Sequence, residues 1–289
     1  MGIVSEARRE WRLLPEEELW FRGEDAKHKT STLQPKLYRH LPEKLTIVPK
    51  AILRTESDLH EEFSRCGAQL HEREMVDDWD WYFLMQHHGA PTRLLDWSDG
   101  CLMAAHFATK GSLSESKGGF IYIVDPYRLV DELKAQQEMK DFKKAWKDYR
   151  LARRKRGKSW PKQWDMAYIP GQHSLYDRAS RAVSTDPPKP NLPDAPLIVD
   201  FPHITRRVAA QRSRFMACGR NKNWLTGWAR ADSSRIWRIF IPKRYFPAIK
   251  VQLRDAGMTE SVIFPDLDGL GRELDQLWNS LKTRASLSK

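Results

Sequence analysis

The sequence has few cysteines and no long apolar run. Its 289 residues include only three cysteines, Cys66, Cys101 and Cys218, which lie far apart and form no CxxC motif. We therefore expect neither a disulfide framework nor a zinc finger. No stretch approaches the roughly 20 apolar residues of a membrane span, and the charged residues 1–12 lack the apolar core of a signal peptide. These absences predict a cytoplasmic protein that has no membrane partner.

Several common catalytic motifs are also absent. The chain contains no GxGxxG, Walker A, HExxH or GxSxG motif, which disfavours a Rossmann dehydrogenase, a P-loop ATPase, a zinc protease and an α/β-hydrolase. His87 and His88 are adjacent, but no third ligand follows at a spacing usual for zinc. We therefore expect no metal cofactor.

Basic and aromatic residues are abundant instead. The net charge is +11 and the chain holds 12 tryptophans, a combination that suits a polyanionic partner, nucleic acid first. Residues 134–164 contain 12 Lys or Arg residues against three acidic ones, with Trp and Tyr between them. Stacking combined with phosphate contacts is how single strands are held, although a solvated basic helix has the same composition. The candidate nucleic-acid-binding residues are Lys143, Lys144, Lys147, Arg150, Arg153, Arg154, Lys155 and Arg156.

Hydrophobic patterning and Gly/Pro positions predict an α+β fold with a mixed β core flanked by helices. The expected strands cover 19–23, 92–98, 119–126, 197–201 and 236–242. The expected helices cover 5–20, 50–86, 102–108, 203–217, 247–256 and a terminal segment after 264–269. We interpret the chain as a single domain over 1–289, into which 134–196 is inserted as a basic helix and a Pro-rich connector.

Three stretches carry a family resemblance: Trp20-Phe21-Arg22-Gly23, then Gln86 to Ser98 with the small-residue helix up to Phe107, and finally Arg206 to Gln211 with Phe215 and, more weakly, Phe264 to Leu267. They resemble the FRG-domain family, named for its Phe-Arg-Gly motif. The order of features is also similar to the ADP-ribosyltransferase superfamily. The second resemblance implies an ADP-ribosyltransferase-like fold and NAD as substrate. The resemblance to the FRG-domain family implies a toxin, with an antitoxin partner, acting in a toxin–antitoxin or phage-defence system.

The resemblance also implies roles for individual residues. Arg22, Ser98 and Gln211 correspond to the catalytic positions, and Gly23 is expected to let the backbone approach a pyrophosphate held by Arg22. The NAD-binding residues it implies are Phe21, Arg22, Gly23, His88, Thr92, Asp96 and Trp97. The chain departs from the superfamily at Gln211, where a Glu is usual, and an amide cannot act as a general base.

The residues themselves leave alternatives open. Ser98 is equally suited to capping the next helix, and Arg93 is expected to pair with Asp96 or Asp99. Glu24, Glu56 and Glu260 are alternative carboxylates for the chemistry. Two other functions fit the composition: a non-catalytic nucleic-acid-binding module, and a metal-dependent nuclease that uses Asp96, Asp99, Asp266 and Asp268.

Overall fold

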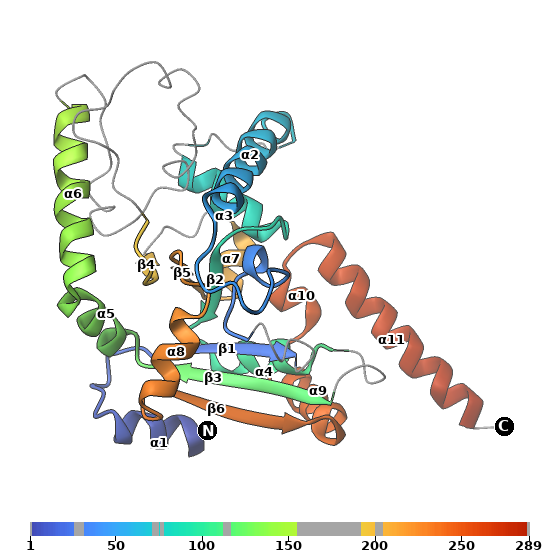
Figure 1. Cartoon of the computed structure of the whole chain (residues 1–289). Helices are drawn as coiled ribbons and strands as arrows, with labels where there is room; N and C mark the ends of the chain where they lie inside the picture. The colour runs from blue at the N-terminus through green and yellow to red at the C-terminus, as the bar shows by residue number, and fades with distance from the viewer. Residues whose placement is uncertain are drawn as a thin grey trace.

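The structure, a computed structural model, describes residues 2–25, 32–70, 75, 78–111, 117–154, 192–199 and 205–287. It has a mixed α+β architecture in which one six-stranded sheet is flanked by helices (Figure 1). The strands are β1 (Trp20–Asp25), β2 (Leu94–Ser98), β3 (Gly118–Val124), β4 (Leu197–Val199), β5 (Ser213–Ala217) and β6 (Ile236–Pro242). Their order is β4-β5-β2-β1-β3-β6 and every pairing is antiparallel.

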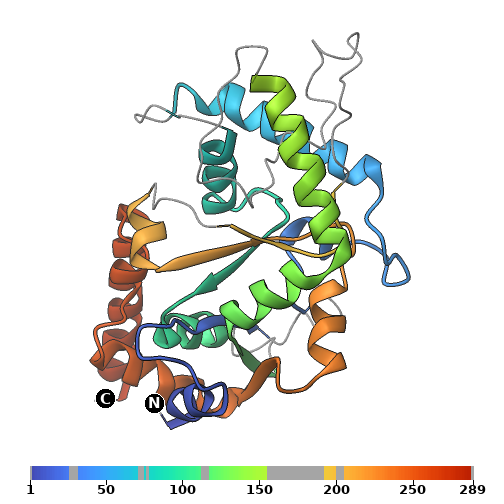
Figure 2. The same cartoon turned by 90° about the vertical axis from the view of Figure 1, so that its left-hand side faces the viewer.

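The helices cover both faces of this sheet. They are α1 (Gly2–Glu10), η2 (Lys36–Tyr38), α2 (Lys50–Gly67), α3 (Asp78–His87), α4 (Cys101–Thr109), α5 (Pro126–Ala135), α6 (Gln137–Arg154), α7 (Arg206–Ala210), α8 (Trp224–Ala231), η5 (Lys243–Tyr245), α9 (Phe246–Asp255), α10 (Glu260–Ile263) and α11 (Leu267–Leu287). Figure 2 shows α5 and α6 in front of the sheet, where Met139 and Phe142 of α6 belong to the main hydrophobic core.

The sheet is split between its two central strands. β1 and β3 pair along six residues, and β2 and β5 along five, but β1 meets β2 only at Phe21 and Ser98. Beyond this contact β2 and β5 run in a different direction from β1, β3 and β6 (Figure 1). Both half-sheets therefore remain internally bonded while a space opens between β1 and β2.

Helix α4 packs directly on β1, as its small residues predict. A Cβ atom added to Gly23 would lie 1.9 Å from the Ala104 carbonyl oxygen and 2.6 Å from the Ala108 nitrogen. Both are backbone atoms, which cannot move aside independently of the helix. The structure therefore gives Gly23 a packing role, because it lets β1 and α4 touch. Its approach to a pyrophosphate stays a prediction.

We expect Gly23→Ala to lower the free energy of unfolding by at least about 1–3 kcal/mol, the usual cost of overpacking. The matched control is Gly227→Ala in α8, where an added Cβ meets no atom within 4 Å. That change should stabilise the protein by up to about 1 kcal/mol, because Ala is a better helix former than Gly. Urea unfolding of both variants checks the prediction, and equal effects would contradict it.

One expected element is wrong. Residues 203–217 were predicted to form a helix, but α7 ends at Ala210 and β5 begins at Ser213. Arg212 between them has φ 48°, a left-handed conformation that ends the helix. Strand β5 then pairs with β2 on one side and β4 on the other, so tertiary pairing overrides the local helical spacing.

Two expected helices differ in extent: the helix expected over 5–20 corresponds to α1, which ends at Glu10, and the helix expected over 50–86 is divided into α2 and α3. The remaining expected elements in the described residues have counterparts at similar positions, with β6 matching its predicted range. Strands on both sides of 134–196 share the one sheet. The expected basic helix corresponds to α6, and the chain from 155 to 191 lies outside the described residues. No described helix is long and apolar enough to cross a membrane.

Candidate functional site

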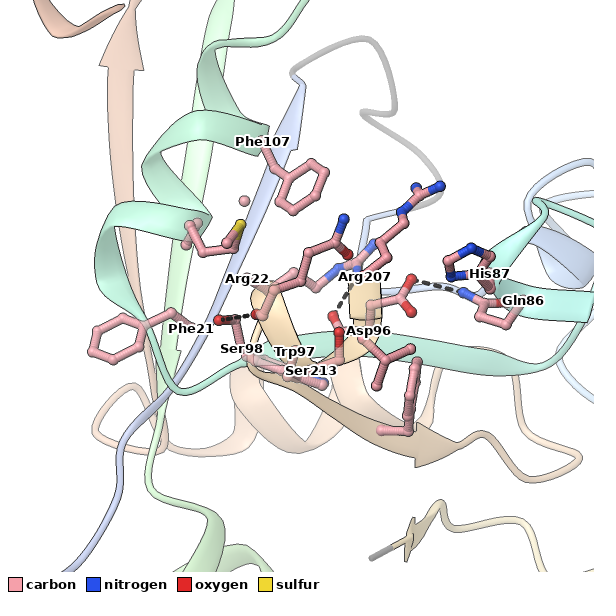
Figure 3. A pocket seen from close by; sticks show the side chains of 16 residues that line it. Phe21, Arg22, Gln86, His87, Asp96, Trp97, Ser98, Phe107, Arg207 and Ser213 are labelled. Atoms are coloured by element: carbon pink, nitrogen blue, oxygen red, sulfur yellow. Dashed lines mark hydrogen bonds between the residues drawn. The ribbon is translucent and has the colours of Figure 1, made fainter. Parts of the chain in front are cut away.

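A cavity of about 200 Å³ occupies the opening between β1 and β2 (Figure 3). All three predicted catalytic residues, Arg22, Ser98 and Gln211, line it. Four of the predicted NAD-binding residues do so as well: Phe21, Gly23, Asp96 and Trp97. Residues from three separate stretches of the chain therefore meet at one place, because β1, β2 and β5 are neighbours in the sheet.

Arg22 bridges the split in the sheet. Its Nε donates a hydrogen bond to Glu24 Oε1 at 2.7 Å, and its Nη1 donates to the Asp96 carbonyl oxygen at 2.6 Å. The residue is only 8% exposed, so it stabilises the strand junction as well as lining the cavity. Its other terminal nitrogen, Nη2, donates to no described residue, which leaves the two N–H bonds of that nitrogen for a ligand.

Asp96 is held by a directed chain of hydrogen bonds. The Leu94 N–H donates to Thr92 Oγ1 at 3.2 Å, and the Thr92 hydroxyl donates to Gln86 Oε1. This contact fixes the orientation of the Gln86 amide, so that its Nε2 donates to Asp96 Oδ2 at 2.7 Å (Figure 3). Burial raises the pKa of Asp96, an effect that the Arg22 charge and the Gln86 hydrogen bond partly offset. Oδ1 of Asp96 accepts no hydrogen bond from the described residues.

Ser98 and Gln211 are joined across β2 and β5. The Ser98 hydroxyl donates to the Gln211 carbonyl oxygen at 2.9 Å and accepts from the Gly100 N–H at 3.0 Å. Gly100, not Ser98, is the N-cap residue of α4, so Ser98 orders the turn before the helix instead of capping it. The Gln211 side chain donates through Nε2 to the Ile263 carbonyl oxygen at 3.2 Å, and this leaves its Oε1 available at the cavity.

Two further residues, Arg207 and His87, lie at the cavity wall and were not assigned to the site from the sequence. The half-buried Arg207 forms no ion pair with a described residue, and its guanidinium carbon lies 4.5 Å from the centroid of the Phe264 ring. Burial lowers the pKa of Arg207 without removing its charge. Burial likewise lowers the pKa of His87 to about 4, and the nearby Arg207 and His88 reinforce the shift. At neutral pH the cavity therefore presents a cation at Arg207 and a neutral imidazole at His87.

The low pKa of His87 makes stability fall in acid. Its pKa is about 4 in the folded protein, against an ordinary value of 6.5. Between these values the unfolded chain binds the proton more readily, so stability is lost as the pH falls from about 6.5 to about 4. We expect the melting temperature of His87→Gln to fall less than that of the wild type when the pH is lowered from 7 to 4.5. Identical losses in differential scanning fluorimetry would contradict this assignment.

Several predicted residues lie elsewhere. Thr92 is buried behind Gln86, and His88 packs near Phe63 with ring centroids 6.4 Å apart, so neither lines the cavity. Lys143, Lys144 and Lys147 are exposed on α6, away from the cavity wall. Arg150, Arg153 and Arg154 belong to α6, but their side chains, like all of Lys155 and Arg156, lie outside the described residues.

The expected ion pair of Arg93 is wrong. Arg93 is fully buried and pairs with Glu56 of α2, with 2.9 Å between Nε and Oε2. Asp99 pairs with Arg212 and with Arg214 instead. Glu24 is bound to Arg22 and Glu260 to Arg272, so Asp96 is the one carboxylate among the described residues that line the cavity.

Other cavity residues carried a sequence signal without an assigned role. Gln86 and His87 begin the second motif, Arg207 belongs to the third, and Phe107 lies in α4, the helix that follows the second motif. Ser213 of β5 also lines the cavity, because it is paired with Ser98 of β2. Among the described residues, no group of three or more His, Cys, Asp or Glu side chains is arranged to hold a metal ion.

Comparison with known proteins gives one match. No curated protein and no solved structure is significantly similar to the chain. The family model of the FRG domain matches residues 17–117, a range that contains β1, β2 and α4, and with them Arg22, Asp96 and Ser98. The third motif lies outside this range. The match therefore supports the FRG family for the part of the chain that supplies the β1–β2 side of the cavity.

Proposed function

We propose that the protein is an NAD-dependent ADP-ribosyltransferase that modifies nucleic acid, with RNA as the favoured acceptor. One observation carries this proposal: Arg22 on β1, Ser98 on β2 and Gln211 before β5 line a single cavity. The three strands are direct neighbours, with Phe21 paired to Ser98 and Ser98 paired to Ser213. This is the arrangement that the resemblance to the ADP-ribosyltransferase superfamily predicts, and it also motivates the proposed ADP-ribosyltransferase-like fold.

The residues that line the cavity offer hydrogen-bonding groups for the pyrophosphate and the ribose of NAD. Arg22 Nη2 and the guanidinium of Arg207, which pairs with no described acidic residue, are two cationic donors for the pyrophosphate. The free Oδ1 of Asp96 can accept from a ribose hydroxyl. The volume of about 200 Å³ is smaller than a typical pocket for a whole ligand, so we place the nicotinamide ribose inside and the adenosine outside.

Asp96 supplies the carboxylate that the third motif lacks. When the bond between ribose C1′ and the nicotinamide nitrogen breaks, nicotinamide leaves with the electron pair and positive charge builds on the ribose. A fixed carboxylate stabilises that charge. The acceptor nucleophile then bonds to C1′, and its proton passes to Asp96 or to water. Gln211 orients the acceptor through its free Oε1, since an amide cannot take the proton.

The exposed lysines of α6 are the proposed contact with the acceptor. Lys143, Lys144 and Lys147 follow one another at spacings of one and three residues, so they form a basic patch on the helix. Such a patch attracts a polyanion and makes binding salt-dependent. The proposed biological setting is a toxin controlled by an antitoxin, in a toxin–antitoxin or phage-defence system.

The test is mass spectrometry of the protein incubated with NAD and total RNA. We expect nicotinamide release and an ADP-ribose adduct on RNA. Arg207→Ala should raise KM for NAD by about 10- to 100-fold, because a hydrogen bond to a charged group contributes about 1.5–3 kcal/mol. Arg22→Ala should abolish the adduct, with a melting curve to verify folding. If the wild type releases no nicotinamide and forms no adduct, the proposal fails, and salt-dependent RNA binding alone would favour the non-catalytic module.

A further inference from the structure

Helix α11 carries an unpaired apolar stripe. Leu267, Leu270, Leu274, Leu277 and Leu281 are separated by alternating steps of three and four residues, the spacing of a coiled-coil seam. These leucines and the adjacent Trp278 are each between 45% and 85% exposed. A run of six large apolar side chains on one face is unusual for a surface that stays in water.

The stripe faces away from the rest of the molecule. Contacts with the body come from another side of the helix, where Arg272 pairs with Glu260 and Glu273 accepts from the Ser261 N–H. Figure 1 shows α11 extending beyond the sheet and its other helices. A second helix can therefore lie along the stripe without displacing any described element.

The charge of α11 is divided along its length. Residues 267–277 include three acidic residues and one basic residue, whereas residues 278–287 include two basic residues and no acidic one. Two copies in parallel would place like charges together, but two antiparallel copies place each acidic half beside a basic half. Such end-to-end complementarity is what a self-pairing helix requires.

We infer that α11 mediates an antiparallel homodimer of this chain. A two-fold axis between residues 275 and 276 places Leu274 opposite Leu277 of the second copy and Leu270 opposite Leu281. The same axis brings Asp268 beside Lys282 of the second copy. This register follows from the spacing of the leucines along α11, and it is independent of the proposed enzymatic activity.

Sedimentation velocity of the full chain over a concentration series tests the association. We expect a reversible dimer for the wild type and a monomer for Leu274→Asp with Leu277→Asp. Both side chains are exposed, so circular dichroism should show an unchanged fold. Lys282→Asp should weaken the dimer, and adding Asp268→Lys should restore it by reversing both charges. A wild type that stays monomeric at its highest soluble concentration overturns the inference.

Oxidative cross-linking tests the orientation. In a Cys66→Ser background, which removes the exposed native thiol, Leu270→Cys with Leu281→Cys should form a disulfide-linked dimer. Neither single substitution should do so, because residue 270 of one copy lies far from residue 270 of the other in an antiparallel pair, and the same holds for residue 281. A dimer cross-linked by Leu281→Cys alone would indicate parallel helices and would overturn the proposed arrangement.

Discussion

Glu56→Ala is expected to lower the free energy of unfolding by about 3–5 kcal/mol, the cost of leaving one partner of a buried ion pair alone. Arg93 is completely buried and Glu56 is 1% exposed. Burial alone would lower the pKa of Arg93, but the Glu56 carboxylate, together with Tyr82 and Tyr38, outweighs it and raises that pKa. Oε1 of Glu56 also accepts from the Tyr82 hydroxyl and from the Arg93 N–H. Removing the carboxylate would leave all these donors, including a full positive charge, in the core.

The matched control is Glu62→Ala in the same helix, whose side chain is 61% exposed and pairs with Arg65. Exposed pairs contribute about 0–1 kcal/mol, so this control should unfold almost like the wild type. Replacing both partners of the buried pair, as Glu56→Leu with Arg93→Met, should recover much of the loss because no charge remains buried. Equal urea midpoints for Glu56→Ala and Glu62→Ala would contradict the role assigned to the pair.

This ion pair holds the second motif in place. Arg93 directly precedes β2, and its partner belongs to α2, 37 residues earlier in the chain. A destabilising change at Glu56 should therefore also loosen the start of β2, which carries Asp96 and Ser98 to the cavity. Sequence reasoning assigned Arg93 to nearby Asp96 or Asp99, because short separations are visible in a sequence and a helix packed from a distance is not.

Local sequence patterns predicted the helices and strands well where the residue types mark clear boundaries between them. The Gly89 and Pro91 break before β2, the small residues of α4 and the short apolar run of β6 each have a counterpart at the expected place. The prediction of a helix over 203–217 failed for a local reason that hydrophobic periodicity does not reveal. Arg212 adopts φ 48° although it is not a glycine. Only the pairing of β5 with two other strands compensates for that conformation.

The cavity itself could be predicted only in part. The motifs identified Arg22, Asp96, Ser98 and Gln211 as candidates, but the space between them depends on β1 and β2 meeting at a single pair of residues. Sheet order and divergence are non-local, so the sequence does not show them. For the same reason the second cation, Arg207, was overlooked: it stands out only because it lines the cavity and pairs with no acidic residue of the described chain.

Asp96→Asn should reduce nicotinamide release from NAD by about 100- to 1,000-fold, the usual cost of removing one preorganised electrostatic contact to a developing charge. The change keeps the shape of the side chain, and the new amide oxygen can still accept from Gln86 Nε2, so we expect a normal melting temperature. What is lost is the negative charge that the proposed mechanism uses to stabilise the ribose. The wild-type rate should also fall in acid as Asp96 is protonated, at a pH above the ordinary range of an aspartate because burial raises its pKa.

Asp131→Asn is the matched control for this charge, because Asp131 lies on α5 with its side chain 79% exposed. The same chemical change at that position should leave nicotinamide release unaltered. Gln86→Leu separates charge from orientation, since it keeps the Asp96 carboxylate but removes the donor that fixes it, and we expect a smaller loss than in Asp96→Asn. If Asp96→Asn releases nicotinamide as fast as Asp131→Asn, the carboxylate between β1 and β2 takes no part in the reaction, and the chemistry must be sought outside this cavity.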